Sequence, residues 1–405
     1  MKRRQAYKFQ IEPNGEQQRS MRRIAGSCRY VWNKALALQI AHHEAGEKFI
    51  NHFTMCKWLP VWKKEPDTLW LKETPAQLFQ VVLKDLEHAY KNFFEKRADF
   101  PRFKKKGRQD SFQFPQWFKI DQGNSRVFLP KLGWVRYRNS RDILGTAKNI
   151  TVSSSGGKWF VSIQTEQEVE QPVHPATSIV GIDVGITRFA TLSSGSFIEP
   201  LSTFRKHQQR LARYQRAISR KTKFSSNWKK AKARVQKIHI RIANVRRDFL
   251  HKTTTTISKN HAIVCIEDLQ VRNMSRSAAG NSEVPGRSVK AKSGLNKSIL
   301  DQGWFEFRRQ LEYKQAWLGG EVLAVPPRNT SRTCPACCHV SAENRRTQAR
   351  FACVECGYEA NADLVGAINV LAAGHAVLAC GGTAQSGRPM KQEPAEATAR
   401  ELTHA

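Results

Sequence analysis

The sequence predicts a mixed fold, in which an α/β domain follows a helical region and a small β-barrel or sandwich. Three observations support this prediction. Residues 1 to about 111 are mainly helical after one short strand, residues 111–168 hold several short alternating segments, and two later apolar runs have the composition of buried strands. A chain of 405 residues is too long for one ordinary core, so two or three domains are expected.

The charge of the chain indicates a polyanionic partner. Lysine and arginine total 67 against 34 acidic residues, which gives a formal net charge of +33. So large an excess repels itself unless a polyanion is bound, and nucleic acid is the expected partner. A basic membrane-surface protein is the alternative, but no apolar run reaches the roughly 18 residues that span a bilayer. The start "MKRRQAYKFQIEP" also lacks the apolar core of a signal peptide, so no membrane is expected.

The clearest N-terminal helix begins at "TPAQLFQ". Thr74 is expected as its N-cap, Pro75 as its first helical residue, and Gln77 as the partner in a capping box. Its apolar residues recur at helical spacing: Leu78, Val82, Leu86, Ala89 and Phe93.

Two basic segments are candidates for nucleic-acid contact. In "FPRFKKKGR" aromatic residues alternate with basic ones, which favours a nucleic-acid backbone over the usual solvated charge run. Residues 201–250 hold 16 Lys or Arg against one acid, whereas a solvated helix normally mixes Glu with Lys. The break "KTKFSSNWKK" predicts two helices here, the second with a packed seam at Val235, Ile238, Ile242, Val245 and Phe249. The candidate phosphate contacts are Arg102, Lys104, Lys105, Arg213, Arg216, Arg220, Lys221, Lys229, Lys230, Arg234 and Lys237.

Short alternating segments between residues 111 and 168 predict the small barrel or sandwich. They are "SFQF", "RVFLP", "WVRYR" and "NITVSSSGGKWFVSIQTE", the last with a Gly156-Gly157 turn between two strands. This fold class often holds oligonucleotides but proves no function. Polar residues 169–177 with their two prolines predict a linker, and the composition after about Gly374 predicts a disordered tail.

Two pairs of cysteines predict a metal site. Cys334 and Cys337 form one CxxC, Cys353 and Cys356 another, and fifteen residues separate the pairs. Four thiolates match tetrahedral Zn²⁺, and they leave no open position, so a structural zinc is expected rather than a catalytic one. Cys338, beside a ligand where glycine is usual, is either a spare thiol or an alternative ligand. Thiols held in such pairs indicate a reducing cytoplasm.

Three acids on separate elements form a second candidate site. Asp183 lies in the apolar run "SIVGIDV", Glu267 in "HAIVCIEDLQV", and Asp363 at the start of an expected helix with Ala362, Leu364, Val365, Ile368 and Leu371. Clustered carboxylates can hold two Mg²⁺ ions about 4 Å apart for phosphodiester cleavage. Carboxylates on apolar strands are costly unless paired or metal-bound. The alternative is that each acid caps a turn or pairs with one of the many arginines.

At these residues the chain resembles a known family. "GIDVGITRFATLSSG", "IVCIEDL", "GLNKSILDQGWFEFRRQLEYK" and "TSRTCPAC…FACVECGYEANADLVGAINVL" look like the TnpB proteins of bacterial insertion sequences, which are compact relatives of type V CRISPR effectors. "YKFQIEPNGEQ…CRYVWN", "FPRFKKKG" and "LPKLGWVRYR" resemble the same family, so the similarity covers nearly the whole chain.

The resemblance implies a RuvC-type nuclease of RNase H-like fold, with a zinc ribbon inserted before its third acid. A helical recognition lobe and a small wedge-like β-barrel are implied before it. The implied boundaries are residues 1–12 for the first barrel strand, 13–110 for the lobe, 111–168 for the barrel, 169–177 for the linker, 178–330 and 358–373 for the nuclease, 331–357 for the zinc ribbon and 374–405 for the tail.

The resemblance also implies the roles of the site residues. Asp183, Glu267 and Asp363 fall on the family's metal-binding acids, and the four paired cysteines fall on its zinc ligands. The implied activity is magnesium-dependent cleavage of double-stranded DNA that pairs with a guide RNA from the element's own end, beside a short flanking motif. The basic helices would then contact heteroduplex phosphates. Gln77, Gln80 and Lys84 are candidates for recognising the flanking motif, with plain solvent exposure as the alternative.

The chain departs from the family's usual residues at two positions. Cys338 replaces a common glycine, and Val365 stands where asparagine is frequent. The segment "KSILDQGWFEF" resembles a mobile lid over the nuclease site, although a simple amphipathic helix explains it equally well. Two other functions are compatible with the pattern: a guide-dependent DNA-binding repressor, and a strand-joining transposase, which also uses three acids and two metals. A monomer on one RNA, cytoplasmic and associated with the nucleoid when bound to DNA, is expected.

Overall fold

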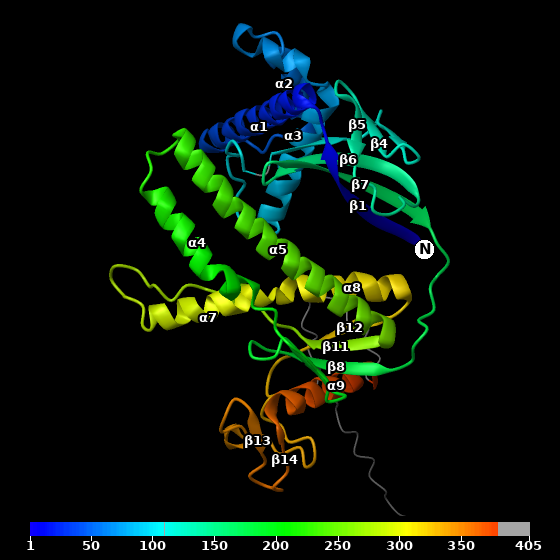
Figure 1. The fold of residues 1–405 in the computed structure, drawn as a ribbon, viewed down its shortest axis with the longest axis vertical. Coiled ribbons are helices and arrows are strands. Elements are labelled where there is room, and N and C mark those ends of the chain that lie inside the picture. The colour runs from blue at the N-terminus through cyan, green and yellow to red at the C-terminus, as the bar shows by residue number, and fades with distance from the viewer. Residues whose placement is uncertain (109, 380–405) are drawn as a thin grey trace, which may run out of the picture. The chain divides into compact units, whose positions relative to one another are not determined.

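The computed structural model describes residues 1–108 and 110–379. The chain divides into two compact units. The first unit consists of Met1–Gln171 and Ala212–Ile240, and the second consists of Pro172–Leu211 and Arg241–Ala405. Figure 1 labels most of the helices and many of the strands of both units.

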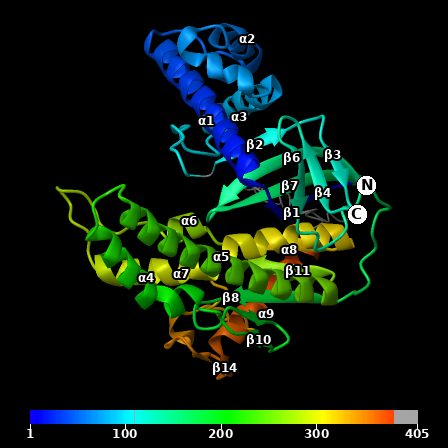
Figure 2. The same ribbon diagram turned by 45° about the horizontal axis from the view of Figure 1, so that its top comes forward.

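Helices dominate the start of the first unit. A strand, β1 (Lys2–Glu12), leads into the helices α1 (Gly15–Glu44), α2 (His52–Trp62), η1 (Pro66–Glu73, a 3₁₀ helix) and α3 (Ala76–Phe94), which Figure 2 shows together. The capping box of this region lies at α1, where Asn14 and Gln17 exchange side-chain and backbone hydrogen bonds of 2.8 and 3.0 Å.

The predicted cap of α3 is wrong. Pro75 takes the N-cap position without a side-chain hydrogen bond, and Gln77 is buried. Thr74 instead ends η1, with its backbone N–H donating to the carbonyl of Leu71. Thr74 therefore ends the preceding 3₁₀ helix, whereas the sequence pattern predicted that it begins the next helix.

A seven-stranded antiparallel sheet completes this unit. Its order is β2-β6-β7-β1-β5-β4-β3. The strands after β1 are β2 (Ser111–Phe114), β3 (Lys119–Asp121), β4 (Arg126–Leu129), β5 (Gly133–Tyr137), β6 (Thr146–Ser155) and β7 (Lys158–Glu168). Strand β1 pairs with β7 from Lys2↔Glu168 to Ile11↔Trp159, so the first residues of the chain join strands more than 120 residues away. The predicted turn between β6 and β7 has two glycines at φ +59° and +80°.

The basic region folds into two helices separated at the predicted break. These are α4 (Thr203–Ser219) and α5 (Ser226–Asn260). Ile238 and Ile242 of the expected seam are buried, but Val245 is 38% exposed. In a straight helix, positions that repeat every 3.5 residues rotate about 20° around the helix axis with each heptad. Residues at the two ends of such a seam therefore do not all face the same packing partner.

The second unit is built on a five-stranded sheet of order β10-β9-β8-β11-β12. Its strands are β8 (Ile179–Val184), β9 (Ala190–Leu192), β10 (Phe197–Ile198), β11 (Ile263–Glu267) and β12 (Glu321–Val325). Strands β8, β11 and β12 are parallel, whereas β9 and β10 add an antiparallel edge. The two helices α8 (Trp304–Leu318) and α9 (Ala362–Ala379) cover opposite faces of this sheet (Figure 1).

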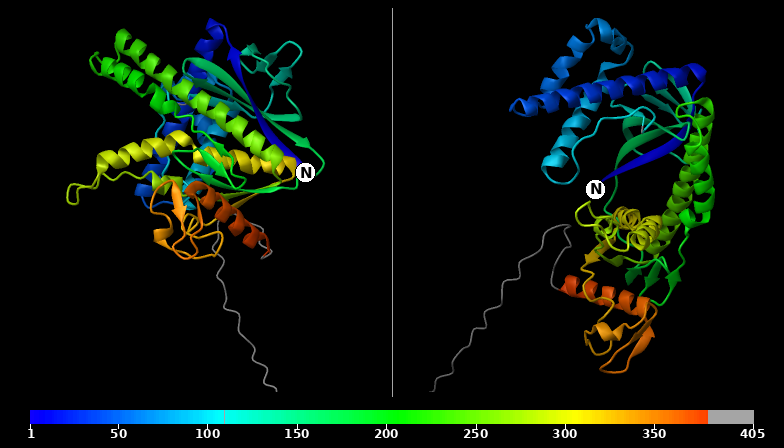
Figure 3. Two further views of the ribbon diagram at one scale, coloured as in Figure 1. Left: turned by 60° about the horizontal axis from the view of Figure 1, so that its bottom comes forward. Right: turned by 90° about the vertical axis from the view of Figure 1, so that its left-hand side faces the viewer.

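The remaining elements connect these parts. They are α6 (Val271–Met274), α7 (Val289–Gln302), η2 (Ala342–Asn344) and the hairpin of β13 (Arg350–Ala352) and β14 (Glu359–Asn361). Figure 3 shows that hairpin, in orange, beside α9 in red. The predicted linker has no helix or strand, yet it packs on the second unit, since His174 donates from Nε2 to the carbonyl of Ser258 at 2.7 Å.

Helix α9 differs from two expectations. It runs to Ala379, so the chain is still helical where the tail was expected to begin at 374; residues 380–405 lie outside the described residues. Its 18 residues, with a mean hydropathy of 1.6, are long and apolar enough to cross a bilayer, contrary to the expectation that no such run exists. However, Asp363 lies in its first turn and its buried residues pack on β8, as in a core helix.

Candidate functional site

Parallel pairing brings Asp183 and Glu267 to neighbouring positions. Ile182 of β8 pairs with Ile266 of β11, and each acid is the next residue along its strand. Because side chains alternate along a strand, the isoleucines face one apolar core while both acids face the opposite side, the side covered by α9. Two carboxylates therefore stand next to each other at the carboxyl ends of the central strands.

Helix α9 brings the third acid to the same place. Its chain approaches β8 so closely that a Cβ added at Gly181 would lie 2.2 Å from the carbonyl oxygen of Ala367. A Cβ added at Gly366 would lie 3.1 Å from Oδ2 of Asp183. Asp363, one turn before Gly366, lies in the first turn of the helix, where a carboxylate is favoured by the helix dipole.

The electrostatics of these acids show that they act on one another. Burial raises the pKa of Asp183 to about 7, and the negative charges of Glu267 and Asp363 add to this rise. Burial also raises the pKa of Glu267. The fold thus crowds three carboxylates at a cost that a bound cation would relieve.

Two further residues complete the site, and the sequence analysis missed both. The hydroxyl of Thr330 donates to Oε1 of Glu267 at 2.6 Å, which lowers the pKa of that carboxyl. Arg345 lies 3.4 Å from Asp363, and its charge lowers the pKa of both Asp183 and Glu267. No spacing rule pointed to either residue, because both come from the segment after β12 that wraps back onto the sheet. Asp268, next to Glu267, pairs instead with Arg308.

The four paired cysteines form a compact group. Their sulfur atoms all lie within 4.8 Å of one another, and the pairs Cys334–Cys356 and Cys337–Cys353 are each 3.6 Å apart. Tetrahedral zinc with bonds of about 2.3 Å places sulfurs about 3.8 Å apart, so the group has the size and chemistry of a zinc site. Among the described residues, the four cysteines are the one group of candidate ligands that lie close enough together to be identified as a metal site from side-chain distances alone.

The two cysteine turns are alike. The backbone N–H of Cys338 donates to the backbone carbonyl of Cys334 at 3.0 Å, and that of Gly357 donates to the backbone carbonyl of Cys353 at 3.1 Å. Cys338 has φ +61° and Gly357 has φ +73°, so the cysteine occupies a backbone position that suits glycine. Its side chain is exposed and lies outside the four-sulfur group, which makes it a spare thiol in this arrangement.

Two asparagines join this cysteine-rich segment to itself and to α9. Buried Asn344 donates to the carbonyls of Arg332 and His339 and accepts from the N–H of Val354, so it links the two turns. Asn369 of α9 donates to the carbonyls of Thr330 and Thr333, each at 2.7 Å. Val365, where an asparagine is frequent in the resembled family, is buried among Cys334, Phe351 and Cys353. The hydrogen bonds between α9 and the cysteine-rich segment are therefore made by Asn369 and not by the residue at position 365.

The predicted phosphate contacts on α4 and α5 have exposed side chains. None of the eight forms an ion pair within the residues described: Arg213, Arg216, Arg220, Lys221, Lys229, Lys230, Arg234 and Lys237. Lys105 is exposed too, whereas Arg102 lies 3.6 Å from Asp99 and the ammonium of Lys104 lies 3.8 Å from the ring centre of Trp32.

The polar strip expected on α3 is partly wrong. Gln80 and Lys84 are exposed, but Gln77 is 7% exposed and neither of its amide atoms has a hydrogen-bond partner. Gln77 lies in the first turn of α3, beside buried Leu78 and Phe79, and is packed with them.

Family models match three parts of the chain. The model described as "Probable transposase" (OrfB_IS605) matches residues 162–278, the "Cas12f1-like, TNB domain" model matches residues 304–370, and a "Helix-turn-helix domain" model matches residues 1–48. In the structure the last of these regions is strand β1 followed by the single long helix α1.

Two curated relatives match nearly end to end. One from Escherichia coli K12, named "Putative RNA-guided DNA endonuclease InsQ", is 61% identical over 98% of both chains. Another from Streptomyces pristinaespiralis, named "Putative RNA-guided DNA endonuclease", is 33% identical over 98% of both chains. Among solved structures, the Cas12f1–sgRNA–target DNA complex matches with a TM-score of 0.58 at 13% identity, covering 91% of this chain and 98% of that one. This last similarity is one of fold.

Proposed function

The chain belongs to the TnpB family, and on that premise we propose that it is an RNA-guided DNA endonuclease of a transposable element. It cleaves DNA that pairs with a guide RNA, next to a short flanking motif. The observation that carries the proposal is the grouping of Asp183, Glu267 and Asp363: burial, together with the negative charges of the other two acids, raises the pKa of Asp183 to about 7. A protein that only bound nucleic acid would have no use for three carboxylates placed where two of them oppose the charge of the third.

In the proposed architecture the five-stranded sheet is the RuvC-type, RNase H-like nuclease domain. Its parallel central strands with an antiparallel edge, and its fold similarity to the Cas12f1 chain, support this assignment. The seven-stranded sheet is the small β-barrel, α1 to α3 are the recognition lobe, and the cysteine-rich segment is the inserted zinc ribbon. The domain boundaries given for these parts in the sequence analysis are kept, except that the nuclease continues to the end of α9.

Asp183, Glu267 and Asp363 fit a magnesium site. All three offer carboxylate oxygens, the ligands that Mg²⁺ prefers, and their mutual repulsion is the cost that cations offset. Two bound Mg²⁺ ions would supply an activated water and stabilise the leaving oxygen. Around the acids, the hydrogen bond from Thr330 favours the charged form of Glu267 against the effect of burial, and Gly366 leaves room for the carboxylate of Asp183. Arg345 supplies positive charge beside Asp363.

The four paired cysteines hold a structural zinc in this proposal. All four positions are filled by sulfur, so the metal has no open site for substrate. The two hydrogen bonds of Asn369 then attach the ribbon to α9, the helix that carries Asp363. Thiolates in this arrangement suit a reducing cytoplasm, with the protein on the nucleoid when DNA is bound.

The exposed cations of α4 and α5 serve as phosphate contacts, which suits a protein that relies on base pairing for sequence. Gln80 and Lys84 of α3 remain candidates for contact with the flanking motif, because both are exposed.

A library experiment tests the proposal. The protein is purified with its copurifying RNA and incubated with a plasmid library in Mg²⁺, as the native chain and as Asp183→Ala. Cutting at guide-matched sites by the native chain, abolished in the variant, is the expected result. Tight guided binding without cutting by the native chain would identify a repressor, and joined rather than cut ends would identify a transposase.

A further inference from the structure

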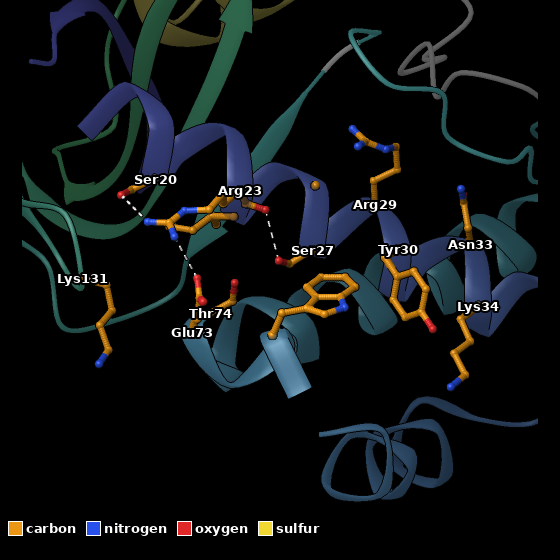
Figure 4. Close-up of a pocket in the computed structure, with 13 residues that line it drawn as sticks. Ser20, Arg23, Ser27, Arg29, Tyr30, Asn33, Lys34, Glu73, Thr74 and Lys131 are labelled. Atoms are coloured by element: carbon orange, nitrogen blue, oxygen red, sulfur yellow. Dashed lines mark hydrogen bonds and ion pairs between the residues drawn. The ribbon is translucent and has the colours of Figure 1, made fainter. Parts of the chain in front are cut away.

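A cavity of about 1010 Å³ lies along one face of α1, within the first unit (Figure 4). Helix α1 contributes Ser20, Arg23, Ser27, Tyr30 and Lys34, which recur at spacings of three and four. Trp70 of η1 and Lys131, from the turn between β4 and β5, close it from other elements. None of the three acids or four paired cysteines lies in it, so it is separate from the proposed nuclease site.

The cavity contains a partly bare aromatic side chain held in a fixed orientation. Trp70 is 41% exposed. Its indole N–H donates to the carbonyl of Asp67 at 3.0 Å, and its ring meets that of Tyr30 edge-on, with centres 5.1 Å apart. An exposed tryptophan costs free energy in water, but a fixed ring with a free face can stack a nucleic-acid base.

Basic side chains surround this aromatic pair, and two of them are already in ion pairs, Arg29 with Asp110 and Lys34 with Glu65. Arg23, Arg29, Lys34 and Lys131 line the cavity, with Glu73 as the one carboxylate among the lining residues described. The Arg23–Glu73 pair, 3.2 Å apart, has both side chains more than 60% exposed, and such pairs contribute little. Lys131 is exposed and forms no ion pair among the residues described. A phosphate can therefore replace the acid at Arg23 and reach Lys131 directly.

The basic segment after α3 is tied to the rim of this cavity. Asn33, which lines it, donates to the carbonyl of Lys104 and accepts from its N–H, at 3.0 and 2.8 Å. Trp32 donates to the carbonyl of Arg102 at 3.1 Å. These bonds fix "FPRFKKKGR" beside the cavity, so a nucleic-acid strand leaving it would meet further cations.

We propose that this cavity binds an unpaired nucleotide, whose base stacks on Trp70 and whose phosphates contact Arg23 and Lys131. The inference rests on the proposed function, because it supposes that the chain carries nucleic acid. A paired base has both faces covered by its neighbours, so a stacking platform of this kind selects an unpaired one. Two sources share this chemistry: the guide RNA and the DNA strand displaced by it.

Crosslinking of the complex tests the proposal. Protein with its copurifying RNA is irradiated before and after addition of matched target DNA, with Asp183→Ala used to prevent cutting, and crosslinked peptides are identified by mass spectrometry. We expect nucleotide adducts on Trp70 or Tyr30. Adducts before DNA is added assign the site to the guide RNA, and adducts only afterwards assign it to the displaced strand. Their absence in both conditions, while other peptides crosslink, overturns the proposal.

Matched variants give an independent measurement. Trp70→Ala and Lys131→Glu are each expected to weaken binding of a ten-nucleotide oligouridine RNA about tenfold, the scale of one stacked base or a lost phosphate contact. The controls are Trp117→Ala, which removes a 72% exposed tryptophan elsewhere in the unit, and Lys119→Glu, which makes the same charge change at an exposed strand position. Equal losses in variants and controls would overturn the proposal. Thermal unfolding of each variant monitors folding, and Lys131→Glu keeps the test valid if Trp70→Ala does not fold.

The failure of this inference is distinguishable from failure of the proposed function. If the native chain cuts guide-matched plasmids while the cavity variants bind and crosslink as it does, only the cavity assignment is wrong. If no RNA copurifies and no guided cutting occurs, the proposed function fails and this inference fails with it.

Discussion

Gly366 of α9 lies directly against the side chain of Asp183, such that a Cβ at position 366 would be 3.1 Å from Oδ2 and 3.2 Å from Cγ. Contacts of that length require the neighbour to move by a few tenths of an ångström. The neighbour is a carboxylate held on a central strand, with Glu267 and Asp363 repelling it from other sides. The absence of a side chain at Gly366 therefore allows the carboxylate of Asp183 to stay where it is.

Gly366→Ala should reduce guided cutting by at least about tenfold, because misplacement of a metal-binding group by a fraction of an ångström costs much of the rate. Binding of guide RNA should be unchanged, since Gly366 faces β8 rather than carrying a charge or an exposed side chain. Rates of plasmid cleavage and RNA affinity measure the two effects. Gly294→Ala is the matched control: it adds the same methyl group within α7, where nothing lies within 4 Å. Equal cutting by both variants would show that the contact is tolerated.

Thr330→Val should change the pH dependence of cutting. The bond from Thr330 favours the charged form of Glu267, and its loss raises further a pKa that burial already raises. Because metal binding needs the carboxylate, the acidic limb of the rate profile should shift to higher pH, with a larger loss at pH 6 than at pH 8.5. Thr333→Val is the control, since the hydroxyl of Thr333 donates to the carbonyl of Asn329. A uniform loss at all pH values would contradict a role through Glu267.

Asp183 and Glu267 could be identified from the sequence, while the surroundings of the acids could not. Asp183 and Glu267 stand out in sequence because each interrupts an apolar run, and parallel pairing of buried strands then places them side by side. Thr330 and Arg345 carry no such signal, because a threonine and an arginine are ordinary in a polar loop. Only the path of the segment after β12 brings them to the acids.

Local capping rules failed for a related reason. "TPAQ" fits a helix start, but a 3₁₀ helix ends at the same threonine, and nothing in the four residues distinguishes the two uses. Trp70 likewise lies in a stretch without periodicity, so its partial exposure beside Tyr30 could not be foreseen. Both features depend on the path of η1, which the local sequence does not specify.

Asp183→Asn should stabilise the metal-free protein at high pH. The folded-state pKa of about 7 lies above the ordinary aspartate pKa of 3.8, so the folded chain binds the proton more tightly than the unfolded chain does. Stability from this group is complete below about pH 4 and is lost as the pH rises to 7, by at most about 4 kcal/mol at about 1.36 kcal/mol per pH unit. In EDTA, the variant should unfold at a higher temperature than the native chain at pH 8 and at a similar one at pH 4.5.

Added Mg²⁺ gives the second part of that test. It should raise the unfolding temperature of the native chain at pH 8 and raise that of Asp183→Asn much less, because a ligand that binds the folded state stabilises it. Asp248→Asn is the control, since that carboxylate is 63% exposed and pairs only with Lys252 on the same helix in the described structure. A native chain that gains no stability from Mg²⁺ would argue against a metal site at the three acids.

Cys338→Gly should stabilise the cysteine-rich segment. A non-glycine residue at φ +61° is strained by roughly 1 kcal/mol, and the matching position of the other turn is Gly357. We expect slower zinc release to a chelator and an unchanged content of one zinc per chain, because the thiol of Cys338 lies outside the four-sulfur group. Gly357→Ala, which introduces the opposite change at φ +73° with nothing within 4 Å of its Cβ, should release zinc faster. Loss of zinc from Cys338→Gly would instead make Cys338 a ligand and exclude its role as a strained spare thiol.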